Sequence, residues 1–183
     1  MKDMSFNSNT TVTAVDQTAV AVKYLRQGWD AQAFMILSEP GYEKNPTAQF
    51  ALGICHLRAG ESLLAIPRFE QALQLLKSAP AAPPATMKGV QENNETYIRL
   101  TVRQIEEKTY LTPMDADFCK SFPKAAEQIA LLATIYAHLQ SSTKEQDPNK
   151  KRVIIEQAKR LSSGLTGQAF EEYKKKLAEN NSV

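Results

Sequence analysis

Apolar and small residues recur at spacings of three and four in two consecutive runs over residues 45–76, which is the periodicity of helices with one buried face. Asn45 can cap a helix, and Pro46 suits the first helical position, so the first helix is expected to begin here. Gly60 is the left-handed residue expected just past its end. The short connection predicts an antiparallel hairpin. The first run is Phe50, Leu52, Gly53, Leu57 and Ala59, and the second is Leu64, Ala65, Phe69, Ala72, Leu73 and Leu76.

Small residues in this hairpin predict that the two helix axes approach closely. Gly53 and Ala65 have almost no side chain, and Phe69 is large enough to fill the space toward a neighbouring unit. The pattern resembles one unit of a tetratricopeptide repeat, and its matching residues are Leu52, Gly53, Ala65, Phe69 and Ala72. It departs from that family at Gln49 and His56. Pro67 lies inside the second helix, where a proline normally costs about 3 kcal/mol.

A helical repeat leaves an apolar face that only a neighbouring unit covers, so the resemblance implies further copies. One copy lies 32 residues upstream, where Gly28 falls opposite Gly60. The other equivalent pairs are Val20 and Leu52, Ala21 and Gly53, Tyr24 and His56, and Ala33 and Ala65. This unit, residues 13–40, is degenerate because Pro40 and its neighbours cut the second helix short. Thr13 followed by Asp16 resembles a capping box, which places the first helix at about residues 13–27.

A third, divergent unit is predicted at residues 123–163. Residues 125–140 have the spacing of a first helix, residues 141–147 are a polar loop, and Pro148 opens a second helix. The apolar stripe of that second helix is Val153, Ile154, Ile155, Ala158 and Leu161. An insertion in the loop costs little entropy. The alternative is an ordinary amphipathic hairpin that is not a repeat.

The remaining segments complete a single all-α domain at residues 13–179. Residues 78–89 hold three prolines and are predicted to be a connector, and residues 93–110 are predicted to form an extra helix. Residues 111–123 are expected to be a break with a short helical turn at most, and residues 167–179 a capping helix. Residues 1–12 are expected to be a disordered tail. The resemblance implies a short right-handed α-solenoid of about seven helices.

Composition limits the classes of partner. The chain of 183 residues is 43% hydrophobic and has a formal net charge of +2, so no strongly acidic or basic partner is implied. The lysines and arginines near the C-terminus alternate with glutamates, which favours a solvated helix face over a nucleic-acid surface. The polar N-terminus lacks a signal-peptide core, and no apolar run is long enough to span a bilayer. We expect a cytoplasmic protein without membrane contact.

Catalytic and metal-binding patterns are missing from the sequence. The two cysteines, Cys55 and Cys119, and the two histidines, His56 and His138, lack zinc-site spacing. Cys55 is expected to pack in a helix, Cys119 to be exposed in the break and His138 to be solvated. No nucleophile signature or phosphate loop is present, and an Asp-x-Asp that begins at Asp115 is expected to cap a helix. We therefore expect no enzyme, no cofactor and no metal.

The resemblance implies a concave groove lined by the first helices of the units, in which a peptide or helix of a partner docks. The groove residues it predicts are Val22, Tyr24, Arg26, Gln49, His56 and Arg58. A family clamp for C-terminal carboxylates is not supported, because its positions are occupied by Thr18, Val22, Ala51, Glu127 and Leu131. The predicted function is a non-catalytic protein-binding module. The alternative is a chaperone similar in size and repeat content to the small repeat-containing chaperones of bacterial secretion systems.

Overall fold

The computed structural model describes residues 16–79 and 112–181 of the chain, and this part is entirely helical, with eight helices and no strand. The prediction of an all-α fold is confirmed. The expected tail at residues 1–12, nearly all of the connector and the extra helix at residues 93–110 lie outside the described residues. The helices are α1 (Gln17–Arg26), α2 (Asp30–Leu37), α3 (Pro46–Arg58), α4 (Ser62–Ser78), α6 (Ala116–Ser121), α7 (Pro123–Lys144), α8 (Pro148–Ser162) and α9 (Gly167–Asn181).

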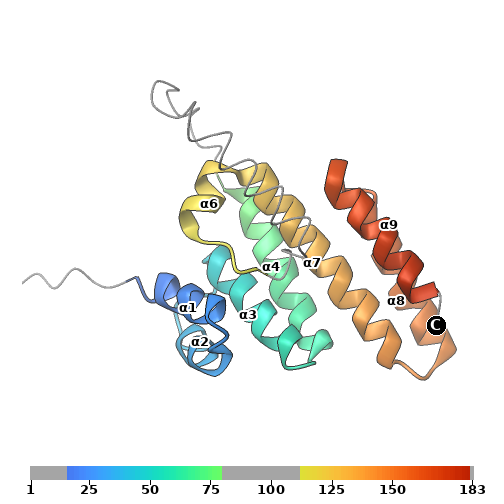
Figure 1. The fold of residues 1–183 in the computed structure, drawn as a ribbon, viewed down its shortest axis with the longest axis horizontal. Helices are drawn as coiled ribbons and strands as arrows, with labels where there is room; N and C mark the ends of the chain where they lie inside the picture. The colour runs from blue at the N-terminus through green and yellow to red at the C-terminus, as the bar shows by residue number, and fades with distance from the viewer. Residues whose placement is uncertain (1–15, 80–111, 182–183) are drawn as a thin grey trace, which may run out of the picture.

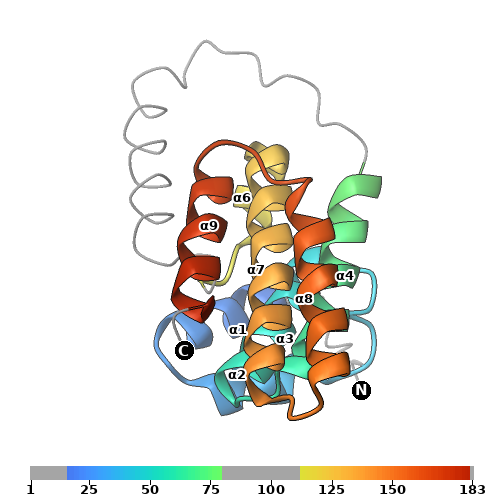
Figure 2. The same ribbon diagram turned by 90° about the vertical axis from the view of Figure 1, so that its right-hand side faces the viewer.

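The helices form a row, with α1 and α2 at one end and α8 and α9 at the other (Figure 1). Along this row α3 packs on α1 and α2, α4 packs on α3, and α7 packs along α4. Figure 2 shows α8 and α9 on either side of α7, and both contact it. Each helix therefore buries its apolar face mainly against its neighbours in the row.

The pair α3 and α4 begins and turns at the residues that the sequence indicated. The side chain of Asn45 accepts a hydrogen bond from the Ala48 N–H at 3.2 Å, and Pro46 is the first helical residue. The chain turns through Gly60, which has a φ of +80°. The second helix continues through Pro67 to Ser78. The cap and the glycine turn predicted at these positions are confirmed.

A close contact between Gly53 and Phe69 holds α3 against α4. A Cβ atom on Gly53 would lie 2.5 Å from Cε1 of the Phe69 ring, so only glycine has room at this position. The Phe69 ring is fully buried and lies 5.3 Å, centroid to centroid, from the Phe50 ring. Ala65 and Ala72 are also fully buried on the same helix as Phe69. Gly53 on α3 thus leaves room for the large aromatic ring of Phe69 on α4.

The turn between α1 and α2 has the same backbone conformation as the turn between α3 and α4, 32 residues later. Gly28 has a φ of +79° and Gly60 a φ of +80°. In both turns the residue after the glycine donates its N–H to a carbonyl five residues earlier: Trp29 to Tyr24 at 2.9 Å and Glu61 to His56 at 2.8 Å. The 32-residue offset predicted from the sequence therefore aligns two turns of the same conformation.

The start of α1 differs from the prediction. The helix begins at Gln17, and Asp16 is its N-cap, whose carboxylate accepts hydrogen bonds from the Thr18 and Ala19 N–H groups. The predicted capping box assigned the cap to Thr13, which lies outside the described residues. The assignment of Asp16 to the third helical position is wrong, because its carboxylate itself binds two of the free N–H groups at the helix start.

The C-terminal half contains two further corrections. Helix α7 runs to Lys144, so the predicted polar loop is wrong over residues 141–144, where Ser141 and Ser142 are buried. The Ser142 hydroxyl donates to the Leu139 carbonyl, which lets a polar residue remain inside the helix. On α8, Val153 is 61% exposed and does not belong to the buried stripe.

The short helix α6 links the two halves of the row. Its N-cap is Asp115, which accepts the Phe118 N–H at 2.7 Å and forms an ion pair with Arg26 at 2.9 Å. Burial alone would raise the pKa of Asp115, but the Phe118 N–H and Arg26 lower it below its ordinary value. Met114, just before α6, is buried in the core. The expected break at residues 111–123 therefore contains a six-residue helix.

Candidate functional site

The predicted groove residues on α1 are occupied by contacts within the chain. Val22 is buried, and Tyr24 lies against the ring of Trp29, with ring centroids 5.4 Å apart. Arg26 donates to the Pro113 carbonyl as well as to the Asp115 carboxylate. Pro113 and Asp115, just before α6, therefore contact the C-terminal end of α1. That end carries Arg26, which was predicted to bind a partner.

The predicted groove residues on α3 also make internal contacts. Gln49 is buried, donates to the Tyr42 carbonyl at 3.0 Å and accepts from Arg68 at 3.1 Å. His56 Nδ1 lies 2.8 Å from the Glu61 carboxylate, and its ring meets Phe34 edge-on. Arg58 donates to the Asp30 carboxylate at 2.6 Å and to the Leu25 carbonyl at 3.0 Å.

Two of the six predicted residues are thus inaccessible to a partner, because Val22 is 2% exposed and Gln49 is 1% exposed. Gln49 instead fastens the loop before α3, through Tyr42, to α4, through Arg68. The contacts bring Arg58 of α3 to the end of α1. A role in partner binding for Tyr24, Arg26, His56 and Arg58 stays a prediction.

The structure reveals a different candidate, a cleft of about 590 Å³ where α3 and α7 begin, α4 ends and α6 passes. We call it the lysine-rimmed cleft. Its volume lies in the usual range of ligand pockets, about 300–1,000 Å³. The described residues that line it are Lys44, Asn45, Pro46, Thr47, Leu76, Lys77, Ala79, Ala116, Cys119, Lys120, Pro123, Lys124 and Glu127.

Polar and apolar groups are separated in this cleft. The apolar lining comes from Pro46, Leu76, Pro123 and two alanines, and four lysines stand around it, all of them exposed. The single carboxylate among the described lining residues, Glu127, lies 3.3 Å from the ammonium group of Lys124. The cleft therefore combines an apolar surface with a positively charged rim.

The cysteine in the cleft is a packing residue. Cys119 is buried, which contradicts the prediction that it is exposed, and its Sγ lies 3.8 Å from the Thr47 hydroxyl. Burial raises the pKa of its thiol, and the Asp115 carboxylate raises it further. Cys55 on α3 is also buried, and burial raises its pKa to about 11. Neither thiol has the low pKa of a reactive cysteine.

His138 was expected to be solvated, and the structure places it in the interior of the α4–α7 interface, with its side chain 6% exposed. Its Nε2 lies 3.8 Å from the Glu70 carboxylate, too far for a hydrogen bond, and has no hydrogen-bond partner among the described residues. Burial lowers the pKa of His138, and the Glu70 charge opposes that shift only in part. Helix α7 continues past His138 for more than a turn, which is why the residue is not at a helix end.

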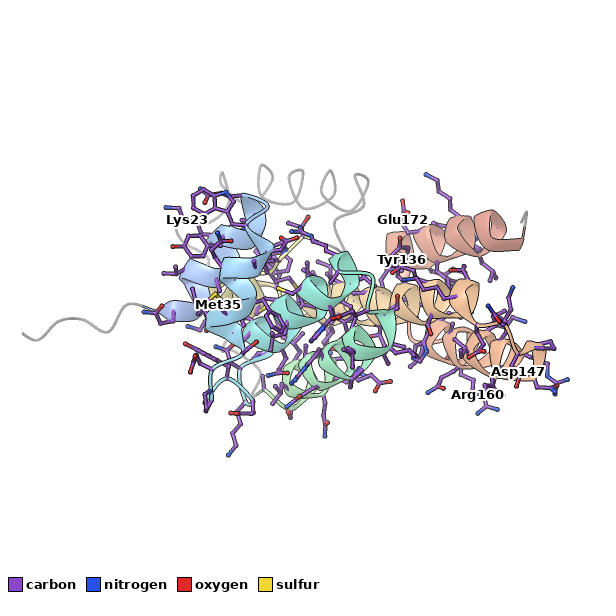
Figure 3. The ribbon with its side chains drawn as sticks, turned by 90° about the horizontal axis from the view of Figure 1, so that it is seen from below. Lys23, Met35, Tyr136, Asp147, Arg160 and Glu172 are labelled. Atoms are coloured by element: carbon purple, nitrogen blue, oxygen red, sulfur yellow. The ribbon has the colours of Figure 1, made fainter. Side chains whose placement is uncertain are left out.

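Large apolar side chains are exposed on α2, at one end of the row, and at the start of α4. Figure 3 shows Met35 on α2, at the opposite end of the molecule from Asp147 and Arg160. Met35 is 71% exposed and Leu63, at the start of α4, is 70% exposed. The exposed apolar residues of α2 and of the start of α4 are Trp29, Phe34, Met35, Leu63 and Leu64.

Metal-ligand clusters and membrane-spanning helices are both missing from the described part of the chain. Within residues 16–79 and 112–181, no three histidine, cysteine or acidic side chains come together as metal ligands. Helices of the length and apolarity needed to cross a bilayer are likewise missing from these two ranges.

No protein-family model matches this chain, and no curated protein or solved structure shows significant similarity to it. The functional interpretation therefore depends on the geometry of the chain itself.

The four lysines of the cleft were not predicted as site residues. They come from the loop before α3, the end of α4, helix α6 and the start of α7, and each one alone resembles an ordinary surface lysine. Only the fold brings them together, so no local signal in the sequence identifies them.

Proposed function

We propose that the chain is a tetratricopeptide-like helical array whose function is to bind a protein partner. The repeat interpretation is supported by the two identical turns at Gly28 and Gly60, 32 residues apart. It is also supported by Ala33 and Ala65, which occupy equivalent positions on α2 and α4 and are both fully buried. Two units of equal turn geometry stack directly on each other.

The pair α7 and α8 is the divergent member of the array. Its connection has no glycine; α7 ends in extended backbone at Glu145, and Asp147 caps α8 by accepting the Asn149 and Lys150 N–H groups. Helix α3 contacts both helices of the preceding pair, and α7 packs along α4. The lysine-rimmed cleft lies where α3 and α7 begin and α4 ends.

The observation that carries the binding function is this cleft. It is open and large enough for several side chains, and it combines an apolar lining with a positively charged rim, the two properties that a recognition site needs. In the described part of the chain, neither a metal-ligand group nor a low-pKa thiol supports catalysis instead.

Affinity capture tests the proposed function. The full chain, immobilised through its N-terminus, is exposed to an extract of the source organism, and proteins retained at about 0.15 M salt are quantified by mass spectrometry. A column carrying the heat-unfolded chain is the control. We expect at least one protein to be retained at near-equimolar amount by the folded chain alone. Retention of none, together with turnover in an unbiased substrate screen, would contradict the proposal.

A second candidate function, a chaperone for one specific protein, is favoured by the exposed apolar residues of α2 and α4. Side chains as large as Met35 and Leu63 with about 70% exposure are suited to holding an apolar segment of a client. A chaperone suppresses aggregation of the captured partner as it is diluted from denaturant. The double variant Met35→Ser, Leu63→Ser should lose that effect while retaining binding at the cleft.

A further inference from the structure

We propose that the lysine-rimmed cleft binds an extended acidic segment of the partner, with at least one apolar side chain seated between the lysines. This inference rests on the proposed protein-binding function and adds to it the place of binding and the chemistry of the bound segment.

The charge of the rim is not neutralised by the described part of the protein. Lys44, Lys77 and Lys120 form no ion pair within residues 16–79 and 112–181, and only Lys124 is matched there, by Glu127. Two helix N-termini, of α3 and α7, and one C-terminus, of α4, meet at the cleft, so the helix dipoles leave a partial positive charge of the same sign as the lysines. The lysines therefore give the cleft a positive charge, and carboxylates are the complementary groups.

The lining of the cleft requires an apolar component as well. Leu76 is buried beneath the surface, and Pro46, Ala116 and Pro123 lie on different elements around it. A purely polar ligand would leave the partly exposed Pro46, Ala116 and Pro123 in water. Burying a side chain such as leucine or phenylalanine there contributes the non-directional part of the affinity.

The arrangement favours a peptide over a small anion or a nucleic acid. A site for a small anion has buried polar groups that converge on one point, whereas all four lysines here are exposed and stand on separate elements. A nucleic acid needs a longer basic surface, and the net charge of the whole chain is only +2. A peptide with several carboxylates in succession matches dispersed lysines.

Selection from a library of random peptides tests the inference without knowledge of the partner. A phage-displayed heptapeptide library is panned against the full chain at about 0.05 M salt. In parallel it is panned against the variant Lys44→Glu, Lys77→Glu, Lys120→Glu. We expect the wild type to enrich peptides that contain two or more acidic residues beside a large apolar one. The variant should not enrich them.

The control variant carries the same change of charge elsewhere. Lys150→Glu, Lys151→Glu, Lys175→Glu alters three exposed lysines on α8 and α9, far along the row from the α3 end of the cleft. The most enriched peptide is then measured by fluorescence anisotropy. We expect its Kd to rise roughly tenfold or more in the cleft variant, and to change by less than about threefold in the control. Far-UV circular dichroism verifies that both variants are folded.

Each outcome decides between the two proposals. Enrichment of neutral or basic peptides would overturn the acidic inference while supporting peptide binding. Equal weakening by both triple variants would also overturn it, because general electrostatic attraction would then explain the effect. Enrichment of no peptide at all would overturn the acidic inference, and the affinity capture would decide the wider function. If single-stranded DNA bound the wild type and lost affinity in the cleft variant but not in the control variant, the lysine rim would be assigned to nucleic acid instead.

Discussion

Gly53 is the residue on which the packing of α3 against α4 depends most. Because a Cβ atom there would lie 2.5 Å from the buried Phe69 ring, Gly53→Ala must displace the ring or separate the helices. We expect a loss of about 1–3 kcal/mol in the free energy of unfolding, although alanine is the better helix former. Chemical denaturation followed by circular dichroism measures it.

Two companion variants make the Gly53 prediction specific. Phe69→Leu in the same chain should remove the clash, so that adding Gly53→Ala to it costs little or even stabilises. Gly164→Ala is the control, since its new Cβ would lie 3.0 Å from the flexible end of Leu131 and 3.5 Å, an ordinary contact distance, from the Leu161 carbonyl oxygen. A Gly53→Ala protein as stable as the wild type would show that α3 and α4 are too far apart for the Phe69 ring to fill the space at Gly53.

His138 makes the stability of the protein depend on pH. Above about pH 6.5, its ordinary pKa, the imidazole is neutral in the folded and in the unfolded chain, so it does not make the free energy of unfolding depend on pH. As the pH falls, the unfolded chain binds a proton and the folded chain does not, because burial lowers the pKa of His138, so stability is lost. Between pH 7.5 and 5.5 the wild type should therefore lose more stability than His138→Leu.

Glu70 is the charged group that faces His138, and it provides the second test. Glu70→Gln removes the charge that partly offsets burial, so the pKa of His138 should fall further and the loss of stability on acidification should grow. Parallel pH profiles for the wild type and both variants would contradict the burial of a neutral imidazole at this position. The carboxylates with lowered pKa values, Glu43 and Asp115, are common to all three proteins and cancel in the comparison.

At the residue scale, the sequence predicted the features that depend on neighbouring residues of the chain, such as helix caps and turns. The cap at Asn45 and the glycine turn at Gly60 follow from groups within one helical turn of each other, and the structure has both. Cys119 and His138 were expected at the surface and are buried, because burial depends on which distant helix covers a residue. That information is not in the local sequence.

At the scale of elements, Pro67 is the feature most at odds with its surroundings. It is exposed in the interior of α4, where it removes the hydrogen bond that an N–H would donate to the carbonyl of Leu63. We expect Pro67→Ala to stabilise the protein by about 1–3 kcal/mol. Pro46→Ala is the control and should be nearly neutral, because the first helical position needs no N–H donor.

The measurement for Pro67 is the midpoint of thermal unfolding. A large rise for Pro67→Ala and none for Pro46→Ala would be the result expected of α4 as one continuous helix. A fall for Pro67→Ala would mean that the proline fixes a bend that the packing of α4 requires, and would contradict the expected cost of a proline inside α4.

Element boundaries were predictable where a strong stop signal occurs and not elsewhere. Asp147 and Pro148 mark the start of α8, and the chain begins that helix there. The end of α7 was set too early because serines and threonines at residues 141–143 resemble a loop. In the folded chain the hydroxyls of Ser142 and Thr143 bond to carbonyls of the preceding turn, so the helix continues to Lys144.

At the scale of the whole molecule, a nearly neutral net charge conceals a local excess of one sign. A formal charge of +2 predicts no charged partner, yet the fold gathers four lysines from separate elements around one apolar cleft. Two of the residues that the sequence predicted to line a concave groove, Val22 and Gln49, are buried. Long-range packing, which no local pattern encodes, accounts for both differences.

The most direct test of the central claim, that this protein binds a peptide in the lysine-rimmed cleft, is a nuclear magnetic resonance titration of the ¹⁵N-labelled chain with the selected acidic peptide. We expect the backbone amide signals that shift to belong to the non-proline residues within 44–47, 76–79 and 116–127. Shifts confined to α1 and the middle of α3 would contradict it and place the binding site in the predicted concave groove. Shifts confined to α2 and the start of α4 would also contradict it and place the binding site at the exposed apolar residues there.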